Sequence, residues 1–231
     1  MPSSPHPLAV LYEDNHLLVV NKPALLPTMG VAAGRQSLLS VAKDYIRVKY
    51  SKPGNVYLGV VSRLDAPVTG IVAIARTSKA AGRLSAAFRE RQVEKTYWAV
   101  VEDIPDVPAA TLEHYLRKDE RHRRVHTTHA DCPDAQLARL HYEVRNSHSN
   151  ISLLEIQLET GRKHQIRVQL AKIGCPLLGD RKYGSRTTFP LGIALHARSL
   201  QFKHPITQQS MRLEAAVPGY WRQQPSLAQL L

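Results

Sequence analysis

The sequence has few cysteines and no long apolar segment. Its 231 residues include two cysteines, and they do not form a CxxC pair. A disulfide framework is therefore excluded, and free thiols in a cytoplasmic protein are the simplest interpretation. No apolar run approaches the ~18 residues that a membrane-spanning helix needs. Residues 1–8 contain three prolines and lack the apolar core of a signal peptide, so we expect a disordered leader there and one domain over residues 9–231.

Motifs that bind nucleotide cofactors or catalytic metals are also missing. The sequence has no GxxxxGKS/T loop, no GxGxxG after an expected strand, no HExxH and no GxSxG. Each of these is a signature of a phosphate, dinucleotide, zinc or serine-nucleophile site, so we expect neither a cofactor nor a metal. Any chemistry must then come from ordinary side chains.

Acidic residues are scarce relative to basic ones. There are 31 Lys and Arg residues against 19 Asp and Glu residues, which gives a formal net charge of +12. Such an excess indicates a polyanionic partner, either nucleic acid or an anionic membrane surface. The cations are clustered rather than evenly spread, which favours nucleic acid.

The densest cluster of cations lies between residues 117 and 129. No apolar periodicity runs through this segment, so we expect an exposed arm or hairpin. Its histidines do not indicate zinc, because no cysteine at ligand spacing lies beside them and the flanking cations repel a metal ion. Two interpretations remain, a phosphate-binding arm and a solvated charged hairpin. The basic residues are Arg117, Lys118, Arg121, Arg123 and Arg124.

Expected strands outnumber expected helices. Runs of apolar and β-branched residues between turn residues predict the strands, and Ser37 and Ser78 open two of the helices. Because the two types do not alternate strictly, we predict an α+β fold, with a mixed or antiparallel central sheet flanked by helices and loops. Strands are expected at 9–13, 16–21, 56–61, 70–76, 94–102, 137–144, 151–159, 193–203 and 210–215, and helices at 37–50, 78–92, from the segment 160–167 to 173, and 221–231.

The helical spacing of apolar residues predicts which faces are buried. These faces are Leu38, Val41, Ala42 and Tyr45 in the first helix, Ala81, Leu84 and Phe88 in the second, and Ile166, Leu170 and Ile173 in the third.

One charged turn lies between two apolar runs. Arg63, Leu64 and Asp65 are consecutive, and Pro67 and Gly70 interrupt the chain shortly after them. A carboxylate held at a core edge beside an arginine has its ionised form stabilised. Asp65 is therefore either a nucleophile or the partner in a structural ion pair, and the residue types alone leave both open.

A second unusual site is the start of the expected third helix. Arg162 and Lys163 fall in its first turn, where the helix dipole disfavours cations by about 0.3–1 kcal/mol each. A local rule that is broken twice indicates a functional position, although tolerated surface charge explains it equally well.

Several stretches together resemble the RluA-type pseudouridine synthases. Five motifs follow one another at the family's spacing over residues 9–217, and the opening NKP also fits. Beside the catalytic turn the chain departs from the family, because Ser62 replaces His and Val68 replaces Thr; Leu25 replaces a Gly that commonly follows NKPA. The matching stretches are Asn21–Pro23, Ser62–Asp65 with Thr69 and Gly70, Glu94–Tyr97, Thr160–Arg167, Leu178–Asp180 with Tyr183 and Gly184, and Leu195–Pro205.

The resemblance implies an isomerase that converts uridine in RNA to pseudouridine on one catalytic domain, without a separate S4-like RNA-binding domain. It implies Asp65 as the nucleophile, Arg167 as its partner and Tyr97 stacked against the target uracil. The uracil has to be flipped out, and Arg63 is the candidate to fill its place. Further RNA-binding residues implied are Arg162, Lys163, His164, Arg117, Arg121, Arg123 and Arg124, with Lys79, Arg83 and Arg89 as further backbone contacts.

The expected partner is a stem-loop of ribosomal or transfer RNA, bound by a cytoplasmic monomer without membrane contact. Two rival functions remain open. One is a non-catalytic RNA-binding or ribosome-assembly protein on the same scaffold. The other is a nucleoside or base hydrolase that would use Asp65 to release free base.

Overall fold

The structure is a computed structural model that describes residues 8–32 and 34–231. The expected leader therefore lies outside the described residues, apart from Leu8. The chain divides into two compact units. The first runs up to Val93 and includes Arg198–Ala216, and the second comprises Glu94–Ala197 and Val217–Leu231. No helix among the described residues is long and apolar enough to cross a membrane.

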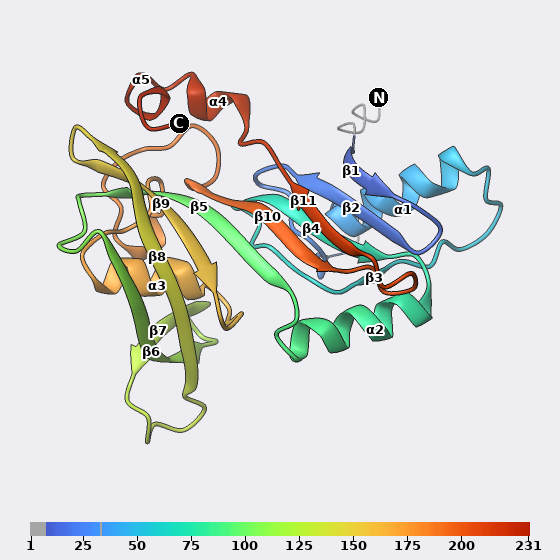
Figure 1. The fold of residues 1–231 in the computed structure, drawn as a ribbon, viewed down its shortest axis with the longest axis horizontal. Coiled ribbons are helices and arrows are strands. Elements are labelled where there is room, and N and C mark those ends of the chain that lie inside the picture. The colour runs from blue at the N-terminus through green and yellow to red at the C-terminus, as the bar shows by residue number, and fades with distance from the viewer. Residues whose placement is uncertain (1–7, 33) are drawn as a thin grey trace. The chain divides into compact units, whose positions relative to one another are not determined.

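The first unit holds a sheet with helices, and β10 contributes residues to both units. The turn between β1 and β2 forms because the Asp14 Oδ1 accepts from the backbone N–H of His16 and of Leu17, each at 2.7 Å. In this unit β1 pairs with β2, β2 and β3 pair with β4, and β11 pairs with β10, all antiparallel. The elements, shown in Figure 1, are β1 (Ala9–Glu13), β2 (Leu17–Lys22), α1 (Leu38–Lys49), β3 (Gly59–Val60), β4 (Thr69–Ala75), α2 (Ser78–Arg89), β10 (Leu195–Lys203) and β11 (Ser210–Glu214).

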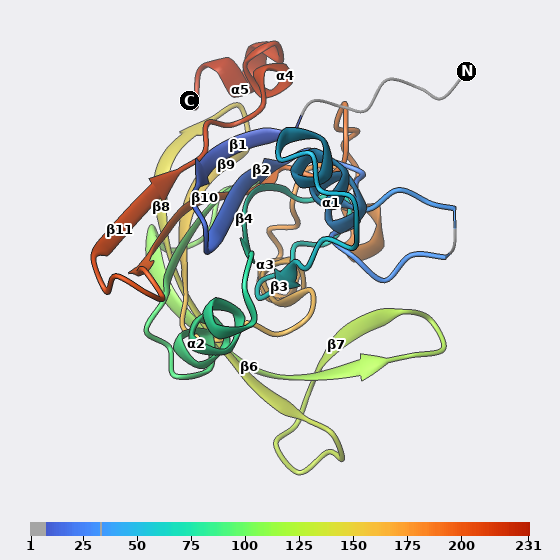
Figure 2. The same cartoon turned by 90° about the vertical axis from the view of Figure 1, so that its right-hand side faces the viewer.

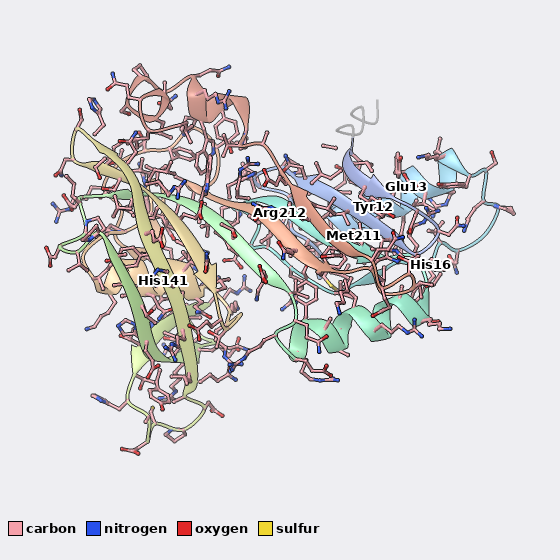
Figure 3. The ribbon with its side chains drawn as sticks, viewed as in Figure 1. Tyr12, Glu13, His16, His141, Met211 and Arg212 are labelled. Carbon is pink, nitrogen blue, oxygen red and sulfur yellow. The ribbon has the colours of Figure 1, made fainter. Side chains whose placement is uncertain are left out.

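Strand alternation divides the core of this unit between the two faces of its sheet. Leu17 and Val19 of β2 join the cluster that contains Leu84 of α2, whereas Leu18 and Val20 join the cluster that contains α1. Successive side chains of a strand point to opposite faces, so both faces of β2 are buried. Tyr12 of β1 and Met211 of β11, labelled in Figure 3, pack at the edge of the first of these clusters.

Helix α1 begins where the sequence predicts it. The Ser37 hydroxyl accepts from the Ser40 N–H, and the Ser40 hydroxyl accepts from the Ser37 N–H, which together form a capping box. The buried face of α1 is Leu38, Ala42 and Ile46; Val41 and Tyr45 of the expected face are only partly buried. In α2 the buried residues are Ala80 and Leu84, while Ala81 and Phe88 are partly buried.

The second unit is an antiparallel sheet in the order β5-β9-β8-β6-β7. In Figure 1 helix α3 crosses behind β8, and the Gln169 Nε2 joins it to both neighbouring strands by donating to Leu112 O at 3.0 Å and to Ala138 O at 3.2 Å. The elements are β5 (Glu94–Glu102), β6 (Ala109–Asp119), β7 (Arg124–Thr128), β8 (Gln136–His148), β9 (Ile151–Leu158), α3 (Gln165–Lys172), the 3-10 turn η1 (Arg181–Tyr183), α4 (Gly219–Arg222) and α5 (Pro225–Ala228).

The α+β class and the sheet flanked by helices confirm the sequence prediction, but several boundaries were wrong. Strand β8 continues to His148, past its expected end at residue 144, and the beginning of β6 at Ala109 was not expected. Only Gly59–Val60 of the expected strand 56–61 forms β3. The expected closing helix 221–231 is two short helices, because Pro225 begins a new one at its first position. Helix α3 starts at Gln165, so Arg162 and Lys163 precede it rather than occupying its first turn, and the dipole argument for them does not apply.

Candidate active site

The Asp65 turn connects β3 to the fully buried strand β4. The backbone N–H of Val68 donates to the Asp65 carbonyl at 3.1 Å and closes the turn. The Ser62 hydroxyl accepts from the backbone N–H of Ala73 at 3.2 Å, so the residue that departs from the family motif binds the neighbouring strand. Asp65 is partly buried and Arg63 is exposed. The turn therefore presents a carboxylate and a cation two positions apart from a hydrogen-bonded backbone.

Lys22 reaches this turn from the end of β2 and is completely buried. Its ammonium donates to Pro23 O at 2.8 Å, to Leu26 O at 2.9 Å and to Ala66 O at 3.1 Å. Three donors on the ammonium thus match three carbonyl acceptors. Burial lowers the pKa of Lys22 to about 7, and the Asp65 carboxylate acts in the opposite direction. One side chain therefore joins the segment after β2 to the backbone of the Asp65 turn.

In the second unit Arg167 is held by Asp180. The guanidinium donates from Nε to Asp180 Oδ2 at 2.6 Å and from Nη2 to Oδ1 at 2.8 Å, and the side chains are 8% and 2% exposed. Such a bidentate, charge-assisted pair fixes the orientation of the guanidinium plane. The Arg167 guanidinium also lies 5.0 Å from the centre of the Tyr183 ring.

Tyr183 connects this pair to the segment before α3. Its hydroxyl lies 2.7 Å from His164 Nδ1 and accepts from the backbone N–H of Val125 at 3.0 Å. Burial raises the pKa of Tyr183, so its hydroxyl stays protonated at neutral pH. His164 adopts a left-handed backbone with φ of 54° and ends the loop that precedes the helix.

The loop 160–164 is organised from inside by Gln165. Its Oε1 accepts from the Thr160 hydroxyl at 2.8 Å and from the backbone N–H of Arg162 at 3.0 Å. Arg162 and Lys163 are exposed, and the Arg162 Nε donates to Leu137 O at 3.0 Å. The two cations thus project from a loop whose backbone is fastened to the protein.

Tyr97 lies in β5, opposite Ile156 of β9, and is partly buried. Asp65 belongs to the first unit, and Tyr97 and Arg167 belong to the second. The structure brings Arg167 together with Asp180 and Tyr183; the pairing of Arg167 with Asp65 stays a prediction.

The basic segment 117–129 forms the hairpin of β6 and β7, which confirms the expected hairpin (Figure 2). Arg117, Lys118, Arg121 and Arg123 are exposed at its end. Arg124 is different, because it is partly buried, donates to Lys182 O and lies 5.4 Å from the centre of the Tyr183 ring. The hairpin therefore offers four solvated cations and one that is bound within the unit.

Sequence reasoning assigned no role to Lys22, Thr28, Asp180 or Tyr183. Lys22, Asp180 and Tyr183 lie in the stretches that resemble the family. Their partners are identified only by the hydrogen bonds and ring contacts of the folded chain. Among the described residues, no group of three or more His, Cys, Asp or Glu side chains is placed to hold a metal ion.

Comparison with known proteins identifies the family of this chain. The chain matches the family described as RNA pseudouridylate synthase over residues 16–172. It is 33% identical to ribosomal large subunit pseudouridine synthase C of Rickettsia prowazekii over 92% of this chain and 69% of the relative. It is also 33% identical to ribosomal large subunit pseudouridine synthase D of Vibrio cholerae, over 92% of this chain and 68% of the relative.

A solved structure gives the same fold. The structure of human RNA pseudouridylate synthase domain containing 4 superimposes with a TM-score of 0.79 at 26% identity, covering 96% of this chain and 92% of that one. The chain therefore belongs to the RNA pseudouridylate synthase family. It is an isomerase that acts on uridine in RNA.

Proposed function

We propose that this isomerase modifies ribosomal RNA, with Asp65 as the group that attacks or stabilises C1′ of the target nucleotide. The observation that carries the proposal is the position of Asp65 on a turn whose backbone is fixed by the buried Lys22 ammonium. Two relatives that are one third identical to this chain are named as ribosomal large subunit synthases, which supports ribosomal RNA as the substrate class. The net charge of +12 is consistent with an RNA partner.

The reaction breaks the C1′–N1 bond of uridine and forms a C1′–C5 bond. As C1′–N1 breaks, its electron pair leaves with the uracil, and positive character develops at C1′ as in glycoside cleavage. A carboxylate there can either add covalently to C1′ or stabilise its charge. The uracil then turns and C5 bonds to C1′; where the carboxylate has added to C1′, that bond breaks in this step and the carboxylate is regenerated. The proton displaced from C5 is taken up by a base while N1 gains one. Isomerisation thus needs no oxidant or external group.

Arg167 and Tyr97 are the proposed partners of Asp65. A guanidinium can orient a carboxylate through charge-assisted hydrogen bonds, as a nucleophile requires. The bidentate contact with Asp180 would position the guanidinium for this role. Tyr97 would stack on the flipped uracil and transfer a proton.

The exposed cations are the proposed RNA contacts. Arg63 would occupy the place that the flipped base leaves, because its planar guanidinium stacks and hydrogen-bonds to bases. Arg162, Lys163 and the exposed cations of the β6–β7 hairpin would bind the RNA backbone, with His164 beside them. We propose that the enzyme is a cytoplasmic monomer. Sedimentation of the purified protein tests whether it is a monomer.

The decisive experiment compares wild type with Asp65→Asn. Ribosomal and transfer RNA transcripts that carry tritium at uracil C5 report turnover, because the C5 proton is lost on isomerisation. We expect wild type to release tritium, and Asp65→Asn to release none while its melting temperature and RNA affinity stay close to wild type. An active Asp65→Asn variant would remove Asp65 from the mechanism.

Two further results separate this function from its rivals. Free uracil among the products would indicate a hydrolase, and RNA binding without any tritium release would indicate a non-catalytic binding protein. Mapping pseudouridine in cells with and without the gene then identifies the RNA and the position.

A further inference from the structure

The segment Pro23–Met29, which we call the clasp segment, is fastened to the Asp65 turn at two points. The Lys22 ammonium bridges a carbonyl of the clasp segment and the Ala66 carbonyl of the turn. Further along, the Thr28 hydroxyl donates to Leu64 O at 2.8 Å and accepts from Leu64 N–H at 3.1 Å. Two independent attachments fix the clasp segment relative to the turn.

Helix α1 provides a third attachment. The carbonyls of Pro27 and Thr28 accept from the first backbone N–H groups of the helix, at Leu38 and Leu39, at 2.8 and 3.1 Å. These N–H groups have no partner inside the helix, so the clasp segment satisfies them. The segment is therefore held on both sides and is not a loose surface loop.

Leu25 is the unusual residue of the clasp segment. Its φ of 62° is in the left-handed region, which is unfavourable for a side chain with a branched apolar group. Its neighbour Leu26 packs against the α1 core cluster, whereas Leu25 is 58% exposed. Strain of this kind persists where the surrounding structure enforces it, and it is common at binding sites. Burial does not explain a leucine at this position.

Apolar and cationic side chains are also exposed elsewhere on the clasp segment and on the turn to which it is hydrogen-bonded. Met29, at the other end of the clasp segment, is 41% exposed. Arg63, next to the Thr28-bound Leu64, is exposed on the turn itself. Exposed apolar side chains on a segment that is hydrogen-bonded to the turn of Arg63 suit a nucleotide, since the base contacts apolar surface and the guanidinium binds phosphate or stacks.

We propose that the clasp segment is an RNA-contact surface in which Leu25 packs as a wedge against the base next to the target uridine. This inference rests on the proposed function, because it takes the Asp65 turn as the place where the uridine is flipped. Leucine and methionine wedges unstack neighbouring bases in other nucleic-acid complexes. Lys22 holds both the clasp segment and the Asp65 turn, so the wedge keeps a constant position relative to the turn. It would then stabilise the unstacked base next to the uridine that is flipped out.

The experiment compares Leu25→Gly with Leu25→Met and with two control variants. Glycine removes the side chain and accepts the left-handed backbone, so Leu25→Gly should keep or raise the melting temperature. Ser51→Gly, at φ of 47°, controls for relief of backbone strain, and Val48→Ala, at a residue 79% exposed in α1, controls for loss of exposed apolar surface.

The probe is a large-subunit ribosomal RNA transcript with tritium at uracil C5, assayed for Kd by filter binding and for KM by tritium release at 50 and 200 mM salt. We expect Leu25→Gly to raise Kd and KM about tenfold, by the same factor at both salt concentrations because the lost contact is apolar rather than ionic. Leu25→Met and the controls should remain close to wild type.

The outcomes separate this inference from the proposed function. Unchanged Kd and KM in Leu25→Gly, while wild type is active, would overturn the wedge and leave the proposed function intact. The same result is expected if the exposed side chains of the clasp segment bind a protein rather than RNA. If wild type releases no tritium, the function fails, and the Kd comparison still decides the RNA contact. A tenfold loss of affinity only at high salt would indicate an indirect ionic effect and would also overturn it.

Discussion

At the scale of single residues, Lys22 is a side chain whose charge depends strongly on the fold. Burial lowers its pKa to about 7 in the folded protein, against 10.5 when it is unfolded. Between these two values the unfolded chain binds more protons, so the free energy of unfolding rises with pH. The slope that Lys22 contributes approaches ~1.4 kcal/mol per pH unit. We expect wild type to gain stability relative to Lys22→Met from pH 7 to pH 10, measured by urea unfolding at a series of pH values.

The difference between the two proteins is the informative quantity, because every other titrating group is common to both. Lys22→Met also leaves three carbonyls without their donor, which lowers its stability at all pH values but does not create a slope. Parallel stability curves would contradict the depressed pKa. They would mean that the three carbonyl acceptors and Asp65 keep the ammonium charged throughout this range.

Asp180 gives a second prediction at this scale. Asp180→Asn removes the charge that compensates the buried guanidinium of Arg167, and breaking such a pair costs about 3–5 kcal/mol. If Arg167 positions Asp65, kcat should fall while KM for RNA changes little. Asp44→Asn is the matched control, since its pair with Arg47 is exposed and contributes at most ~1 kcal/mol. A variant that is destabilised yet keeps full kcat would assign Asp180 a structural role alone.

At the scale of elements, the sequence predicted what short-range contacts decide. Helix α1 starts at the expected place because Ser37 caps it through residues three positions away. The β1–β2 hairpin follows from Asp14, because its side chain accepts hydrogen bonds from the backbone two and three positions further along the chain. Helix α3 was placed too early, because its start depends on Gln165 reaching back to Thr160 and on the left-handed backbone of His164. The periodicity of apolar residues indicates neither this hydrogen bond nor the left-handed conformation.

The same distinction applies to the candidate site. The Asp65 turn could be found from sequence because a cation, a carboxylate and chain-breaking residues are adjacent there. Lys22 could not, since its acceptor Ala66 is 44 positions away. Asp180 was likewise missed as the partner of Arg167, because the pairing depends on how the loop after α3 folds back onto the helix.

The β6–β7 hairpin carries the prediction that belongs to this scale. Replacing Arg117, Lys118, Arg121 and Arg123 together by Gln removes four exposed cations without disturbing Leu116 or Val125, which are buried. If they bind phosphates, each should contribute about 0.7–0.9 to the slope of log affinity against log salt. Filter binding of ribosomal RNA over a salt series measures the loss.

The matched control replaces two exposed cations of the same unit, Arg145 and Arg222, by Gln. These should leave the salt slope nearly unchanged, because they lie outside the hairpin. If the hairpin variant has the slope of wild type, the hairpin is a solvated charged surface, which is the alternative interpretation of its composition.

At the scale of the whole molecule, the two compact units have core clusters of their own. Leu18 belongs to a cluster built from the first unit, and Leu153 belongs to one built from the second. Regions with separate packing can open separately, with different free energies. Replacing either leucine by alanine lowers the free energy of unfolding of its own unit by about 2–5 kcal/mol.

We therefore expect Leu18→Ala to accelerate amide hydrogen exchange mainly in β2, β4 and α1, and Leu153→Ala to accelerate it mainly in β5, β8 and β9. Exchange followed by mass spectrometry on peptic peptides resolves these segments. If either variant instead accelerates exchange uniformly in both sets of strands, the chain opens as one cooperative body. In that case stabilising the second unit, for example around Arg167 and Asp180, would also protect the Asp65 turn, and the Asp180→Asn and Lys22→Met effects would no longer be independent.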